Sequence, residues 1–150
     1  MISLSQLAAN EEIRQIEAKY FYYTDTKQWD KMPAIFLPDA ETDFREAVEP
    51  HNPAMLGHNL KIFIANNKYA LDGVKTAHFG FNPQIEFLND NEATAIWGME
   101  DWLWIPEGSA VLPKGTMHGW GHYFDTYRCL DGRWFISKTK LTRIKIDYIA

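Results

Sequence analysis

The first half of the chain places its apolar side chains at helical spacing. Over residues 10–27, the side chains that recur three or four positions apart are Ile13, Ile16, Tyr20 and Thr24. Asn10 precedes the acidic residues that begin this run, so it is the predicted N-cap of a first amphipathic helix. A second, shorter helix is expected from Asp30 to Phe36, stopped by Pro38, and a third over residues 56–70.

From Val74 onward the period of the apolar pattern changes to two, which is typical of strands. Four such segments follow one another: residues 74–88, 92–106, 117–130 and 133–149. The turns at Asn89-Asp90 and Asp131-Gly132 favour antiparallel pairing. An earlier stretch, residues 39–50, alternates loosely and indicates a short strand or hairpin. Helices in front of long antiparallel strands predict a single α+β domain over residues 1–150, with helices covering one face of the sheet.

The composition limits the functions that the chain can serve. Its 150 residues carry a formal net charge of −5, which argues against a nucleic-acid surface because such a surface needs clustered cations. No apolar run approaches the length that spans a bilayer, and the single Cys129 fits a reducing compartment, so we expect a cytoplasmic protein with no nucleic-acid or membrane partner. Aromatic residues reach 15%, more than a small core needs, which predicts that some of them line a hydrophobic pocket or an interface.

Two of the histidines lie where an unpaired imidazole would be costly. His78 and His122 are each inside an extended segment among apolar neighbours. Each could be a core histidine satisfied by a backbone carbonyl, or a group with a chemical role. A metal site is not expected, because His118 and His122 are four residues apart in a strand pattern and no carboxylate completes a set nearby.

Asp25 is unusual because it follows an aromatic run at the end of the first predicted helix, where the helix dipole disfavours a carboxylate. It could simply be solvated at the helix end. Alternatively it reaches the imidazole of His78, orients it and raises its basicity, which is the pairing that general base catalysis uses.

Three stretches of the chain together carry a family resemblance: EEIRQIEAKYFYYTDTKQWDKMPAIF, TAHFGFNPQIEF and GHYFDTYRCLDGRWFISKTKLTRIKID. In this layout the chain resembles the SnoaL-like branch of the nuclear transport factor 2 fold. The resemblance covers about residues 10–147. It implies a cone-shaped α+β domain, with three N-terminal helices packed on a strongly curved, mostly antiparallel sheet and a pocket between them.

The resemblance also implies roles for individual residues. In the family's lyases an Asp near the end of the first helix pairs with a His that opens a strand, and these positions match Asp25 and His78. Tyr20 matches the position of a tyrosine in the bile-acid dehydratases, which implies a hydroxyl donor. His122 lies in the strand where scytalone dehydratase has a second His.

One position departs from the family pattern. The last-strand Arg of the dehydrochlorinase and bile-acid enzymes aligns with Thr139 here. Arg143 shares a strand face with Thr139 by alternation, so we expect it to enter the same cavity at a different depth. Arg128 is the second candidate for this anion-stabilising role.

The implied activity is that of a cofactor-independent lyase of the dehydratase type, acting on a small cyclic or polycyclic hydroxy-carbonyl substrate. No metal or organic cofactor is expected. We expect a homo-oligomer, and a trimer more than a dimer, because the lyases that the chain resembles are trimers. Two alternatives stay open. One is a ketosteroid-isomerase-like or polyketide-cyclase-like enzyme, and the other is a non-catalytic ligand-binding or assembly module.

Overall fold

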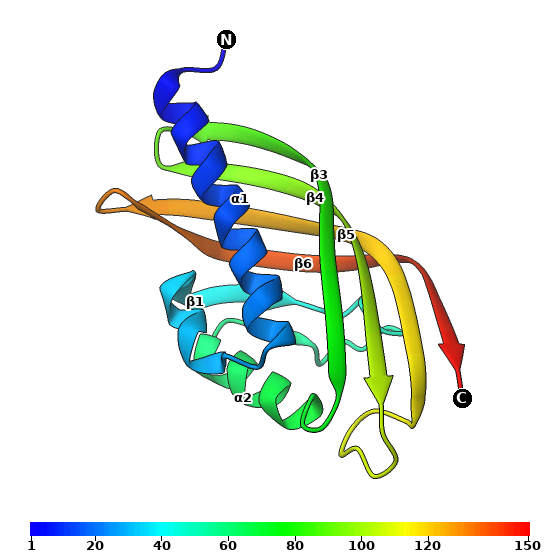
Figure 1. Ribbon diagram of the computed structural model, residues 1–150. Helices are drawn as coiled ribbons and strands as arrows, with labels where there is room; N and C mark the ends of the chain where they lie inside the picture. Colours follow the sequence, from blue (N-terminus) through cyan, green and yellow to red (C-terminus); the bar gives the residue numbers. More distant parts are fainter.

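The computed structural model describes residues 1–150 as a curved sheet with its helices on the inner side (Figure 1). The helices are α1 (Leu4–Asp25), a short 3-10 helix η1 (Trp29–Ala34) and α2 (Leu60–Ala70). The strands are β1 (Phe36–Asp43), β2 (Leu56–Gly57), β3 (Lys75–Asn89), β4 (Glu92–Ile105), β5 (Gly115–Leu130) and β6 (Arg133–Ile149). Their order across the six-stranded sheet is β2-β1-β6-β5-β4-β3, and only β1 and β6 run parallel. The expected mixed α+β fold with a curved, mostly antiparallel sheet is confirmed.

The helices depart from the prediction of three N-terminal helices, because only two of them are long. α1 begins at Leu4 and not at residue 10. Its true N-cap is Ser3, whose hydroxyl accepts from the Gln6 N–H (3.2 Å), while the Gln6 side chain accepts from the Ser3 N–H (3.0 Å). The helix expected from Asp30 to Phe36 is the shorter η1, which contains Pro33 and so lacks one backbone donor inside it.

The segment before α2 is also assigned differently. The helix expected over residues 56–70 begins only at Leu60, because the Asn59 side chain accepts from the Ile62 N–H (3.2 Å) and caps it there. The preceding Leu56–Gly57 forms β2, which pairs with the end of β1. No helix in the structure combines the length and the apolar character needed to cross a membrane.

The sheet has an inner face toward the helices and an outer face that no helix covers (Figure 1). On β4, Ala95, Trp97, Met99 and Asp101 are buried, whereas the alternate residues are partly exposed. On β5 the buried set includes Tyr123, Asp125 and Tyr127. The inner sets pack against Ile13, Ile16 and Tyr20 of α1, so the core fills the space between α1 and the sheet.

Candidate active site

Asp25 and His78 form a close pair where the end of α1 meets the start of β3. The Asp25 carboxylate lies 2.6 Å from His78 Nδ1 and accepts from the His78 backbone N–H (2.9 Å) and from the Thr76 hydroxyl (2.8 Å). These donors hold a carboxylate at a helix C-terminus that the helix dipole disfavours. With Nδ1–H donating to the carboxylate, Nε2 keeps its lone pair and can act as a base.

The other nitrogen of His78 faces a second ion pair. His78 Nε2 lies 3.9 Å from Asp101 Oδ2, and Arg143 donates to both oxygens of Asp101 at 2.6 and 2.9 Å. Arg143 Nε also donates to the carbonyl of Ala47 (2.9 Å). The Asp101 and Arg143 side chains, which we call the inner ion pair, are only 3% and 7% exposed. Their contact is therefore little weakened by solvent.

Two glycines of β5 allow the inner ion pair to form. Gly119 lies opposite Asp101, and a Cβ at this position would lie 2.4 Å from Arg143 Nη1 and 2.5 Å from Asp101 Oδ1. Gly121 lies opposite Arg143 beside a β-bulge, where a Cβ would lie 1.9 Å from the Thr142 carbonyl oxygen. The first glycine leaves the space that the ion pair occupies, and the second permits the close approach of β6.

A cavity of about 570 Å³ between α1 and β3 reaches the Asp25–His78 pair. Phe21, Tyr22 and Trp97 contribute apolar lining, and Arg14 and Glu11 contribute charged groups farther along α1. The ring of Phe21 lies parallel to the His78 imidazole, with centroids 6.1 Å apart. A mostly apolar hollow with a titratable pair in its wall is the usual form of a small-molecule site.

Comparison with known proteins places this fold and its sequence in one family. The family model described as a SnoaL-like domain matches residues 5–140. The chain belongs to the SnoaL-like domain family. A probable cyclase from Gibberella zeae is 24% identical over 88% of this chain and 89% of that protein.

Solved structures of other proteins share this architecture. A type 2 hexachlorocyclohexane dehydrochlorinase superposes with a TM-score of 0.81 at 19% identity, covering 98% of this chain and 93% of that one. A scytalone dehydratase candidate from Novosphingobium aromaticivorans gives a TM-score of 0.79 at 18% identity, covering 97% and 91%. At these identities the superpositions establish the fold of this SnoaL-like chain and not its reaction.

The residues expected beside the Asp25–His78 pair lie at different depths in the fold. Tyr20 is buried in the core, where its ring packs against those of Phe36 and Tyr123 at centroid distances of 5.5 and 6.0 Å. Desolvation raises the pKa of Tyr20 above its usual range, so its hydroxyl stays protonated. Arg143, expected on the inner face of β6, lies there and faces Asp101.

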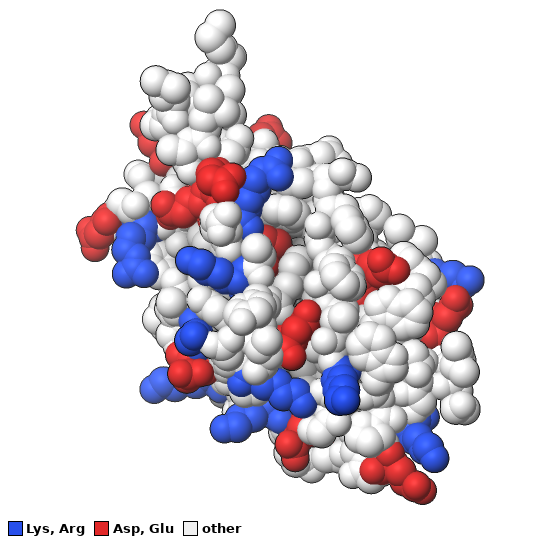
Figure 2. All heavy atoms as spheres, in the orientation of Figure 1, with Lys and Arg blue, Asp and Glu red and all other residues white.

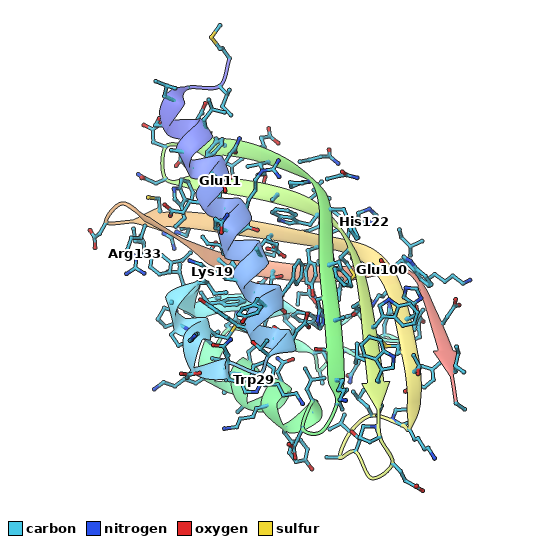
Figure 3. The ribbon with its side chains drawn as sticks, in the orientation of Figure 1. Glu11, Lys19, Trp29, Glu100, His122 and Arg133 are labelled. Atoms are coloured by element: carbon cyan, nitrogen blue, oxygen red, sulfur yellow. The ribbon has the colours of Figure 1, made fainter.

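His122 and Arg128 are not brought to the site. The imidazole of His122 lies on the outer face of the sheet, and its ring centroid is 6.3 Å from that of the exposed Phe124. Figure 3 shows His122 to one side of α1. His122 is next to the buried Tyr123 in β5, and neighbouring side chains of a strand lie on opposite faces of the sheet. Arg128 is exposed on the same face near the end of β5. The match of His122 to a second catalytic His is therefore not supported by its position.

Asp101 is the site residue that the sequence analysis missed. It follows Trp97 and Met99 at strand spacing on β4, so a charged residue continues an apolar alternation. A carboxylate on a buried strand face needs a partner. That pattern was the available signal, but both alternating sets of β4 are largely apolar, and the sequence alone did not show which set faces inward.

A second buried acidic cluster lies deeper in the core. The Tyr127 hydroxyl lies 2.9 Å from Glu17 Oε2 and 3.2 Å from Asp125 Oδ2, and it accepts from Trp97 Nε1 (3.0 Å). Desolvation raises the pKa of Glu17 well above its ordinary value and that of Asp125 to about 6. The other oxygens, Glu17 Oε1 and Asp125 Oδ1, have no hydrogen-bond partner. Burial therefore favours a proton on Glu17, next to the Asp125 carboxyl.

Proposed function

We propose that this SnoaL-like protein is a cofactor-independent lyase of the dehydratase type, which removes water from a small cyclic or polycyclic hydroxy-carbonyl compound. The observation that carries the proposal is the fixed Asp25–His78 pair. The carboxylate holds Nδ1 at 2.6 Å, and Nε2 is directed toward the inner ion pair. An imidazole held in this way, with its second nitrogen free of the carboxylate contact, can act as a general base.

The proposed elimination uses His78 for both proton transfers. Nε2 removes the proton from the carbon next to the substrate carbonyl, and the electron pair of that C–H bond forms an enolate. The enolate then expels the hydroxyl on the neighbouring carbon, forming the C=C bond. The imidazolium returns its proton to the departing oxygen, so one water leaves and His78 is neutral again. The charge of Asp25 stabilises the intermediate imidazolium.

The enolate oxygen needs donors that are in place before it forms. Arg143 supplies charged N–H groups beside His78, at present directed to Asp101. A substrate oxygen that takes one of these N–H groups from Asp101 would be stabilised as its charge develops. Tyr20 is the proposed second donor, since burial keeps its hydroxyl protonated. The carboxylate of Asp101 adds to the stabilisation of the imidazolium from the Nε2 side.

Two other functions use the same features. An isomerase or cyclase would move the proton and keep the oxygen, and the relative described as a probable cyclase favours this alternative. A non-catalytic ligand-binding or assembly module would use the cavity alone, without need of the fixed Asp25–His78 pair. The three functions differ in whether the compound leaves the site lighter by one water, rearranged at unchanged mass, or unaltered.

The test begins with compounds that the purified protein retains from its host, identified by mass spectrometry. Each compound and its hydroxy-carbonyl analogues are then incubated with wild type, with His78→Ala and with His51→Ala, a control at an exposed loop histidine. A product lighter by one water, formed by wild type and His51→Ala but not by folded His78→Ala, supports the lyase. A product of unchanged mass supports the isomerase, and recovery of the unaltered compound in all three supports the binding module.

A further inference from the structure

The cavity beside the Asp25–His78 pair is long, because it follows one side of α1. Its lining includes residues of this helix that recur three or four positions apart and so lie on one face: Glu11, Arg14, Gln15, Ala18, Tyr22 and Asp25. Arg14 lies about three helical turns before Asp25, or about 16 Å along the helix axis. A ligand that reaches both ends of the cavity is therefore elongated.

The middle of the cavity is apolar. Ala18 and Phe21 line it from α1, and Phe81 and Trp97 line it from β3 and β4. Glu17 also contributes to the wall, and burial raises the pKa of its carboxyl well above the ordinary value, which favours the uncharged form. The part of the ligand between the two ends is therefore an apolar body, which gains from its removal from water.

Arg14 brings an unpaired positive charge to the end of the cavity that is farther from His78. The Lys and Arg residues that form ion pairs lie elsewhere in the chain: Arg45, Lys114, Lys138, Lys140, Arg143 and Lys145. Glu11, one turn before Arg14 on α1, accepts a hydrogen bond from Gln15 Nε2 (2.9 Å). No other Lys or Arg lines the cavity. A guanidinium without a carboxylate of its own can bind one through two parallel N–H groups.

Charges of both signs are dispersed over the face of the protein that carries α1, and this face has no broad basic area (Figure 2). A nucleic acid or another polyanion needs clustered cations, so it does not match this surface. A ligand with a single anionic group matches a single guanidinium.

We infer that the cavity binds an elongated apolar compound with one carboxylate, which pairs with Arg14 while the other end of the compound lies at His78. This inference rests on the proposed function for the identity of the reacting end. It narrows the substrate to a hydroxy-carbonyl compound that is also an acid. Arg14 is then a residue that determines specificity and takes no part in the proton transfers, since it lies about 16 Å along α1 from Asp25.

The experiment compares two fluorescent probes that share a pyrene ring system and differ in charge, 1-pyrenebutanoate and 1-pyrenebutanol. Each probe is titrated with the whole chain at neutral pH, and its dissociation constant is measured by fluorescence anisotropy. Wild type is expected to bind the carboxylate at least about fivefold more tightly than the alcohol, because only the carboxylate forms charged hydrogen bonds with Arg14. Arg14→Gln should reduce this preference to less than about twofold. The control is Lys19→Gln, which removes a charge from an exposed position of α1 outside the cavity (Figure 3) and should keep the preference.

A further variant, Ala18→Trp, shows whether the probes bind in the cavity. Ala18 is exposed, so a large side chain there should fill the middle of the cavity, leave α1 intact and weaken the binding of both probes at least about tenfold. Binding that Ala18→Trp leaves unchanged would overturn the inference. Failure of wild type to bind either probe, equal affinity for the two, or a preference that persists in Arg14→Gln would also overturn it. Because turnover is not measured, a protein that binds the carboxylate as expected and forms no product contradicts the proposed lyase and not this inference.

Discussion

Replacing Glu17 by Gln tests whether the core of this protein holds a shared proton. Glu17 is 1% exposed and lies beside Asp125 and the Tyr127 hydroxyl, with no cation among its contacts. An amide of the same shape can donate to Asp125 and accept from Tyr127. It keeps the geometry of the cluster and removes the titration of Glu17.

The expected gain follows from the cost of keeping Glu17 protonated. The ordinary pKa of a Glu carboxyl is 4.5, and burial raises the pKa of Glu17 well above it. At a pH between these two values the folded chain holds a proton that the unfolded chain has released, which costs about 1.4 kcal/mol for each pH unit above the ordinary value. We expect Glu17→Gln to raise the free energy of unfolding at neutral pH by at least about 1 kcal/mol, since the amide titrates in neither state.

The pH dependence of stability is a second test of the raised pKa values of Glu17 and Asp125. Because the pKa values of Glu17 and Asp125 are both raised, the folded chain binds more protons than the unfolded chain, and stability falls as pH rises. For Asp125 this loss occurs between 3.8 and about 6, and for Glu17 it begins near 4.5 and continues above that. The Glu17→Gln variant should therefore lose less stability than wild type between about pH 5 and pH 8.

The assay is urea unfolding followed by circular dichroism at several pH values, with salt and protein concentration held fixed because any assembly of copies adds a concentration term. Glu11→Gln is the control, since Glu11 is exposed on the same helix and should shift stability by less than about 0.5 kcal/mol. A Glu17→Gln protein that is no more stable than wild type at neutral pH, with the same slope against pH, would refute the shared proton.

Three further substitutions test the candidate active site, once a substrate is found. Folded His78→Ala should lose at least about a thousandfold in turnover and Asp25→Asn nearly as much, and kcat/KM close to wild type in either would remove the proposed base. Tyr20→Phe should raise the activation barrier by about 2 to 4 kcal/mol, and an unchanged kcat would show that Tyr20 is not a donor. Gly119→Ala should displace the inner ion pair and lower the midpoint of urea unfolding. Gly98→Ala is the control and should not lower it, because its Cβ would lie 3.5 Å from the nearest atom. Equal effects of the two substitutions would contradict the steric argument.

The strands and the first long helix could be predicted from the sequence because their apolar periods are long. The exact ends could not, since they depend on caps that compete locally. Asn10 and Ser3 are both good N-cap residues, and only the reciprocal bonds between Ser3 and Gln6 decide for Ser3. The short strand or hairpin expected over residues 39–50 is a strand that begins earlier, at Phe36, ends at Asp43 and pairs parallel to β6. Such a pairing depends on residues far away in sequence.

The Asp25–His78 contact could be expected from two isolated signals and the family resemblance, but the second His could not be placed. His122 and Tyr123 are adjacent in β5, and one step along a strand changes the face on which a side chain lies. Burial of Tyr123 fixes the inner set, so His122 faces outward among aromatic residues. The sequence shows that side chains alternate along the strand. It does not show which of the two alternating sets faces the core when both sets are largely apolar.

Gly119 shows how a feature that looks weak in the sequence can be essential in the fold. Two glycines in a strand reduce its intrinsic stability, and by pattern alone they suggest only a bulge or a close approach. In the structure the missing Cβ of Gly119 is the space in which Arg143 meets Asp101. That pair in turn sets what faces His78 Nε2. The chemistry proposed at His78 therefore depends on an absent side chain on another strand, which is why the charged partners could be named only once β4, β5 and β6 were in register.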